Sequence, residues 1–548
     1  MSRKVEELSV LIVDANPAMR SQLRNMLAMS GISKIAHVVT AGAAVRRLRE
    51  HSPDLILCEY HLGEGQDGQH LLEDLRGNNL IPLSTLFLMI TGERQQEKVI
   101  SAAELAPNDY ILKPFSAEKL LGRISRALLK RDVFRPIYRH IELGNPIEAI
   151  RACQAGEQEH PEYLIDFLRM RAELHVAAGQ PEEAEAIYQR VLESRAVPWA
   201  RLGLARTLYM QKRHAESEEI LEDLLRENAN YLDAYDWLAR TRQAMGNVEE
   251  AKRTLENAVR VSPHTVRRLR ELGEVSAATG DMETAARVLG TVVNKNKYSD
   301  FRNPEDHVLL IKAQLGAGDE AGATATLRDL ERSMENVAGT ALCSAIGETL
   351  LAAHQGDAGR AGAALSEALR MHVPEDASSA ALRKDLARLC IAQNREDEAA
   401  TLVMEIMRHA ADDTAVEELK NMMAELGHAD LGHQLAEHVR SEVRHIMSEG
   451  AQLAQSGDYE GAVRQMLDAA KRLPGNTNVA FNAALALLKH IEHRGWNAEF
   501  ATSARHHIER VRRQDPSNPR LAALLGFYHQ LSQSHGGEGA GGNERPAA

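Results

Sequence analysis

Roughly the first 130 residues alternate short apolar runs with stretches of helical periodicity. Five runs have the length and continuous apolar character of strands buried on both faces of a sheet, namely residues 8–13, 35–39, 55–58, 86–90 and 110–112. Helical spacing fills the intervals at residues 17–30, 41–51, 68–77 and 95–105, and Ser116 is placed to cap a fifth helix at residues 117–131. This alternation predicts a parallel, doubly wound α/β sheet with right-handed crossovers.

Beyond residue 131 the pattern is helical throughout, and one signal recurs in it. A glycine is followed five positions later by an alanine, starting at Gly144, Gly179, Gly246, Gly280, Gly318, Gly356 and Gly457, and Asn394 once replaces the glycine. Gly246 and Gly280 are 34 residues apart, and the pattern resembles the tetratricopeptide repeat family over about the last three quarters of the chain. Helix pairs of this kind cannot bury their apolar faces alone, so they are expected to stack into a superhelical solenoid.

Polar residues stand at the C-terminal ends of four of the predicted strands. Asp14 follows the first strand, Glu59 the third, Thr91 the fourth and Lys113 the fifth. In an open α/β sheet these strand ends meet at one edge, where ligands bind. The four side chains are therefore expected to converge in a single crevice.

The motifs that carry these residues, VLIVDANP, PDLILCEYHLGEGQDG, MITGE and DYILKPF, resemble the receiver domain of two-component response regulators. The resemblance covers about the first quarter of the chain and implies a flavodoxin-like fold. It also implies a phosphoacceptor at position 59, an acidic Mg²⁺ pocket around Asp14, and phosphoryl-binding roles for Thr91 and Lys113. Tyr110 takes the place of the aromatic residue that changes rotamer in that family, with an ordinary strand aromatic as the alternative.

Two residues depart from the family's pattern. The acceptor position holds Glu59 where the family has Asp, and Ala15 stands where the family has the second acid of the first-strand pair. The longer side chain moves the acceptor oxygen, and a misplacement of ~1 Å can slow transfer about a hundredfold. Mg²⁺ needs near-octahedral oxygen ligands, and only Asp14, Glu59 and the neutral oxygen of Asn16 remain as candidates. We therefore predict weak or absent metal binding and no phosphotransfer.

Without a metal, the Glu59 carboxylate is expected to pair with the Lys113 ammonium and to receive a hydrogen bond from Thr91. An anion in that position occupies part of the volume of an aspartyl phosphate, so Glu59 would imitate the phosphorylated state. The alternative is a decayed site that is kept only for packing.

Three segments follow from these patterns: a receiver domain at residues 1–131, a helical repeat array at 132–531 whose last helix, at 521–531, is a cap, and a disordered tail at 532–548. Only a short segment with Pro136 separates the last receiver helix from the first repeat helix, which is predicted to begin at Phe134. The receiver is therefore expected to sit against the solenoid.

Composition narrows the function further. A net charge of −13 argues against nucleic-acid binding. We expect no secretory leader, because the first residues form no apolar segment, and no membrane insertion, because no apolar run reaches ~20 residues. Cys58, Cys153, Cys343 and Cys390 form no CxxC pair, which indicates reduced thiols in the cytoplasm.

No enzymatic motif follows residue 131, so we predict no catalytic residues and no cofactor, with Mg²⁺ bound only if the receiver pocket works. The expected function is a cytoplasmic signalling adaptor that binds partner proteins in the concave groove of the solenoid, best formed at residues 168–294. The alternative is a conventional response regulator whose phosphorylation switches that binding. A histidine kinase or another receiver are candidate partners, and the receiver offers a surface for a homodimer.

Overall fold

The structure, a computed structural model, describes residues 7–62, 67–92, 109–263, 265–372, 379–410, 413–473, 475–514, 518 and 520–536. Contacts divide the chain into two compact units, Met1–Leu174 with Glu182–Asp357 and His175–Pro181 with Ala358–Ala548. Separate hydrophobic clusters lie within them, for example around Leu57 in the first unit and around Met466 in the second.

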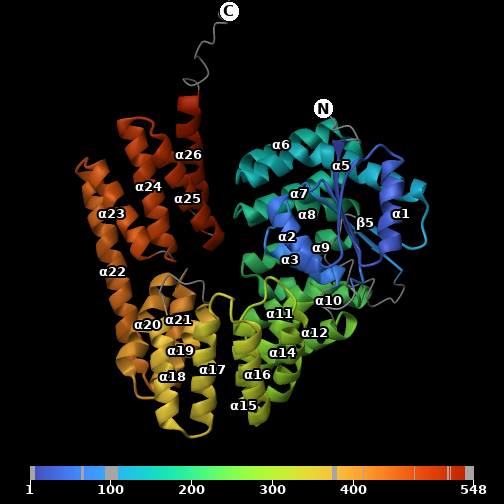
Figure 1. The fold of residues 1–548 in the computed structure, drawn as a ribbon. Helices are drawn as coiled ribbons and strands as arrows, with labels where there is room; N and C mark the ends of the chain where they lie inside the picture. The colour runs from blue at the N-terminus through green and yellow to red at the C-terminus, as the bar shows by residue number, and fades with distance from the viewer. Residues whose placement is uncertain are drawn as a thin grey trace, which may run out of the picture. The chain divides into compact units, whose positions relative to one another are not determined.

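Five parallel strands form a sheet in the first unit (Figure 1). They are β1 (Ser9–Val13), β2 (Lys34–Val38), β3 (Leu55–Glu59), β4 (Leu86–Thr91) and β5 (Asp109–Leu112), in the order β2-β1-β3-β4-β5. Both β3 and β4 are buried along their whole length, as continuous apolar runs require. The predicted doubly wound α/β fold is confirmed, and no strand end differs from its prediction by more than one residue.

Helices cover both faces of this sheet: α1 (Pro17–Ala28), α2 (Ala41–Glu50), α3 (Gly68–Gly77) and α5 (Ala117–Glu142). Leu23 of α1 and Ile124 of α5 join the cluster on one face, whereas Val45 of α2 and Leu71 of α3 join the cluster on the other. The helix predicted at residues 95–105 lies outside the described residues.

The last helix of the sheet domain does not end where the sequence predicted. A single 26-residue helix, α5, runs through Pro136 into the repeats, so the predicted break between residues 131 and 134 was wrong. Proline removes one helical hydrogen bond, but Phe134 and Ile137 on either side of it are almost completely buried. Burial of these apolar side chains maintains the helix despite the proline.

From α5 to Gly536 the described residues form further helices. Their bounds are α6 (Pro146–Glu159), the 3₁₀ turn η2 (Pro161–Tyr163), α7 (Leu164–Ala177), α8 (Pro181–Ser194), α9 (Pro198–Met210), α10 (His214–Glu227), α11 (Leu232–Ala244), α12 (Val248–Val261), α13 (Val266–Ala278), α14 (Met282–Asn296), α15 (Glu305–Gly316), α16 (Glu320–Ser333), α17 (Thr340–His354), α18 (Ala358–Met371), α19 (Ala380–Ala392), α20 (Glu396–His409), α21 (Asp413–Glu425), α22 (Ala429–Gln455), α23 (Tyr459–Arg472), α24 (Thr477–Arg494), α25 (Ala498–Gln514) and α26 (Leu521–Gly536). Within each unit many consecutive helices pack on one another, for example α9 to α15 in the first and α19 to α25 in the second, as stacked helix pairs require.

The recurring glycine and alanine have separate structural reasons. Gly246 and Gly280 lie just past the ends of α11 and α13 with φ angles of +82° and +80°, a left-handed conformation that ends a helix and that glycine adopts without strain. Asn394 takes the same role with a φ of +58°. The alanines Ala251 and Ala285 are fully buried in α12 and α14, where a larger side chain would push the paired helices apart.

The C-terminal helix α26 reaches Gly536, so residues 532–536, which were predicted to belong to a disordered tail, are helical. Residues 537–548 lie outside the described part of the chain. Among the described helices, none has both the length and the apolar character needed to cross a membrane.

Candidate functional site

The candidate pocket lies at the C-terminal edge of the sheet, where β1 delivers Asp14. This side chain is only 2% exposed, and its Oδ1 accepts the Asn16 N–H at 2.7 Å. Burial raises the pKa of the Asp14 carboxyl above its ordinary value, while the Asn16 N–H and the Lys113 ammonium oppose that rise. The carboxylate is therefore held in a partly desolvated site.

Glu59, the last residue of β3, occupies the centre of the pocket and is 9% exposed. One carboxylate oxygen, Oε1, accepts the His61 N–H at 3.2 Å. The other, Oε2, accepts a hydrogen bond from the Lys113 ammonium. The same ammonium lies 3.6 Å from Asp14 Oδ2, so one cation contacts both carboxylates.

Backbone pairing fixes the origin of the Lys113 side chain. Its N–H donates to the carbonyl oxygen of Thr91 at 2.8 Å, and the bond from Lys113 to Pro114 is cis. Thr91 is fully buried at the end of β4. Tyr110 is half-buried on β5 and packs against the hydrophobic cluster that α2 and α3 cover. The structure thus brings Asp14, Glu59 and Lys113 into direct contact, and the switching role of Tyr110 stays a prediction.

A bound Mg²⁺ would need several oxygen ligands in this pocket, and some of the candidates already have other partners. Asn16, the residue that could have replaced the missing acid, uses its side-chain oxygen to cap α1, accepting the N–H groups of Ala18 at 2.9 Å and Met19 at 3.4 Å. Arg20 Nη1 donates to the Asp14 carbonyl oxygen at 2.7 Å, so a second cation lies close by. Within the described ranges, no group of three or more His, Cys, Asp or Glu side chains could hold a metal. The described part of the pocket thus offers a cation two carboxylates, Asp14 and Glu59, and the Lys113 ammonium contacts both of them.

The first turn of α3 also borders the pocket, although the sequence motifs did not point to it. The Gly68 N–H donates to the Tyr60 carbonyl oxygen at 2.7 Å, and a Cβ at Gly68 would collide with the carbonyl oxygen of Glu59. Asp67 caps the helix by accepting the His70 N–H at 2.8 Å. The glycine after Asp67 was the available signal, because close backbone approach demands it.

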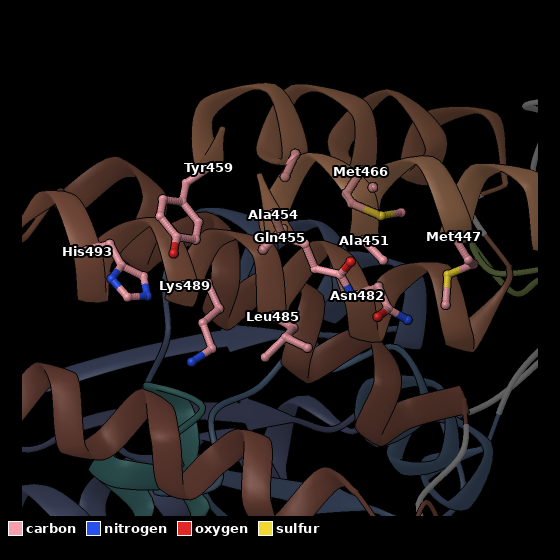
Figure 2. A pocket seen from close by; sticks show the side chains of 13 residues that line it. Met447, Ala451, Ala454, Gln455, Tyr459, Met466, Asn482, Leu485, Lys489 and His493 are labelled. Carbon is pink, nitrogen blue, oxygen red and sulfur yellow. The ribbon is translucent and has the colours of Figure 1, made fainter. Parts of the chain in front are cut away.

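A second candidate site lies in the second unit, between α22, α23 and α24. It is a pocket of about 370 Å³ whose wall is mainly small and apolar, with a few polar groups. In Figure 2, Tyr459 and His493 stand at one end and Met447 at the other. The two rings at the first end stack with centroids 4.4 Å apart. Lys489 also lines the pocket and donates to Glu492 at 2.7 Å.

Comparisons with known proteins find relatives of both parts of the chain. The family model of the response regulator receiver domain matches residues 10–125, and two tetratricopeptide repeat models match residues 211–274 with 352–423 and residues 169–231. The chemotaxis protein CheY of Bacillus subtilis is 31% identical over 119 residues, which are 22% of this chain and 96% of that protein. CheY-3 of Vibrio cholerae is 28% identical over 121 residues, covering 22% of this chain and 92% of its own.

Among solved structures, a crystal structure of a tetratricopeptide repeat protein from Parabacteroides merdae is similar to part of this chain. It shares 14% identity with a TM-score of 0.31 and covers 47% of this chain and 97% of its own. The repeats follow a five-stranded sheet that is similar in sequence to CheY over nearly all of that protein's length. This chain therefore belongs to the response regulator family, as a receiver domain fused to tetratricopeptide repeats.

Proposed function

We propose that this protein is a cytoplasmic, non-enzymatic signalling adaptor in which an unphosphorylated receiver is rigidly joined to a repeat scaffold that binds partner proteins. The observation that carries the proposal is the contact between the Lys113 ammonium and Glu59 beside Asp14. In a phosphorylatable receiver this lysine would be needed by the phosphoryl oxygens. Here the Lys113 ammonium is already paired with the Glu59 carboxylate.

The chemistry of transfer also supports an unphosphorylated receiver. Phosphoryl transfer depends on positioning and on a metal that neutralises the developing charge. Ala15 removes one carboxylate from the pocket, and the amide oxygen of Asn16 is committed to capping α1. With Mg²⁺ weakly held or absent, Glu59 stays paired with Lys113, and the receiver is held in one state.

Acetyl phosphate labelling of three proteins tests this state. The wild type and Glu59→Asp are expected to remain unlabelled, because Ala15 still leaves the acid pair incomplete. The double variant Ala15→Asp/Glu59→Asp should become labelled in the presence of Mg²⁺. Labelling of the wild type to the level of the double variant would replace this proposal with the conventional response regulator, which the retained Asp14, Thr91 and Lys113 favour.

The repeats are proposed to bind partners, because stacked helix pairs expose an extended concave surface. The predicted groove at residues 168–294 is one place for a partner, and the pocket between α22 and α24 is another. Lys489→Glu should remove partners from that pocket in pull-downs with the full chain. Arg494→Glu, a matched reversal at the last residue of α24, should retain them. Equal retention by both variants would move partner binding away from this pocket.

A further inference from the structure

The repeats contact the receiver a second time, far along the chain from the helix that joins them. His70 Nε2 of α3 lies 3.2 Å from Asn296 Oδ1 at the end of α14. Next to it, the Ser299 hydroxyl donates to Asp74 Oδ2 at 2.6 Å, and the Arg267 N–H at the start of α13 donates to Glu73 Oε1 at 3.2 Å. Three polar side chains of one helix face therefore meet three residues of the repeats.

A partly apolar contact extends this interface to α2. Arg49 lies 3.8 Å from the carboxylate of Asp300 and 5.6 Å from the ring centroid of Phe301. Phe301 itself packs against the receiver's hydrophobic cluster. The connection between α14 and α15 thus supplies both charge and apolar area to the receiver.

The repeat side of the interface is held in place by buried charges. Asn296 Nδ2 donates to Asp306 Oδ2 at 3.0 Å, and Arg270 binds the same carboxylate through two bonds of 2.6 and 2.9 Å. Asp306 is 2% exposed. Because a carboxylate only accepts hydrogen bonds, the amide nitrogen of Asn296 must face it, which leaves Oδ1 for His70. His70 Nε2 is consequently the donor in that contact.

On the receiver side of the interface, α3 packs directly against the end of β3 in the pocket. The first residue of α3, Gly68, is packed against the backbone of Glu59 and bonded to Tyr60. Tyr60 Oη also donates to Gln69 Oε1 at 3.3 Å. The end of β3, which positions Glu59, is therefore in direct contact with the first turn of α3, which carries His70.

We propose that α3 is the output surface of this receiver and that the start of α13 with the α14–α15 connection is its docking site. The inference rests on the proposed state of the pocket, in which Lys113 holds Glu59. With that pair intact, α3 is docked on Asn296 and Ser299. When the pair is broken, the end of β3 shifts, α3 is released, and residues 296–306 are uncovered. The state of the Glu59–Lys113 pair thus decides whether residues 296–306 of the solenoid are covered or exposed.

Hydrogen exchange on the full chain tests the docking. Ser299→Ala removes the interface hydrogen bond to Asp74 and also the local one that Ser299 Oγ accepts from the Phe301 N–H at 3.0 Å. Exchange in α3 therefore reports the docking, and it should rise about two- to tenfold. Thr291→Ala is the control, because that hydroxyl donates to the Arg287 carbonyl oxygen within α14. An equal response to both substitutions, or none in α3, would overturn the docking site.

Glu59→Gln tests the coupling separately. Exchange should rise in residues 296–306 as well as in β3 and α3, and adding Ser299→Ala should increase it by less than the sum of the two single effects. A change confined to the receiver would overturn the coupling while leaving the proposed function intact. Failure of the proposed function would instead appear as acetyl phosphate labelling of the wild type.

An engineered disulfide across the interface tests the docking without weakening the fold. The four native cysteines are buried, so Asp74→Cys with Ser299→Cys supplies the reactive pair. Mild oxidation should give a disulfide within one chain, and the trapped protein should lose the response of residues 296–306 to Glu59→Gln. No disulfide within the chain, or an unchanged response after trapping, would contradict the proposal.

Discussion

The rings of Phe134 and Phe167 stack with centroids 4.4 Å apart and planes inclined by 19°. Phe134 belongs to α5, the last receiver helix, and Phe167 to α7, an early repeat helix. Both side chains are 1% exposed. Because α5 is continuous, this ring pair joins the core of the first repeats to the helix that covers one face of the sheet.

Phe134→Ala should lower the free energy of unfolding of the full chain by about 3–5 kcal/mol, since it removes a buried aromatic side chain and leaves a cavity. Urea denaturation followed by circular dichroism measures the change. Leu129→Ala, on the same helix but 61% exposed, is the control and should change stability by less than about 0.5 kcal/mol. Equal losses for both variants would mean that the ring stack does not join the two domains energetically.

Mg²⁺ titration should separate this pocket from one with a complete acid pair. The wild type should give no saturable heat in calorimetry at low millimolar Mg²⁺, because Asn16 caps α1 and Lys113 lies between Asp14 and Glu59. Ala15→Asp/Glu59→Asp should bind with a measurable affinity. Saturable binding by the wild type would show that the lysine leaves the pocket readily.

Some of these features could be predicted from the sequence, and others could not. The convergence of Asp14, Glu59 and Lys113 follows from a topological rule, because parallel strands end at one edge. The capping role of Asn16 was also within reach, since it precedes a proline at the first helical position. The contact between His70 and Asn296 joins positions 226 residues apart, and no local pattern signals it.

The continuity of α5 was hidden for a different reason. Pro136 is a strong local signal for a helix break, and local propensity is the only information that a single sequence offers there. Tertiary burial of Phe134 and Ile137 outweighs that signal. The repeat glycines, in contrast, were predictable because each acts locally, as Gly246 does at the end of α11.

His507 in α25 should make stability depend on pH. It is 6% exposed, and burial, with the nearby charges of Arg510 and His506, lowers its pKa to about 4. An unfolded histidine titrates near 6.5, so the unfolded chain takes up its proton first as the pH falls. The stability linked to the neutral imidazole is therefore fully present above about pH 6.5 and is lost between about pH 6.5 and 4.

Thermal unfolding midpoints at about pH 7 and about pH 5 measure this loss. His507→Gln should reduce the drop in midpoint between the two conditions, because residue 507 no longer titrates. His433→Gln, at an exposed position of α22 away from His507 in the sequence, should keep the drop of the wild type. An unchanged drop in His507→Gln would assign the pH dependence to other groups.

The pair between Glu59 and Lys113 should contribute to the local stability of the receiver. Glu59 is about nine-tenths buried and the Lys113 side chain is 20% exposed, so removing either partner leaves the other charge poorly solvated.

Glu59→Gln and Lys113→Met should each lower the opening free energy of β3 and β4 amides, measured by hydrogen exchange, by roughly 1.5–3 kcal/mol, as for hydrogen bonds to charged groups. The double variant should lose less than the sum, because each single substitution already removes the same ion pair. Arg151→Ala, which breaks an exposed pair with Glu148, should change exchange by less than about 1 kcal/mol. If the losses for Glu59 and Lys113 simply add, the two side chains act independently, and the receiver is not held in one state by their contact.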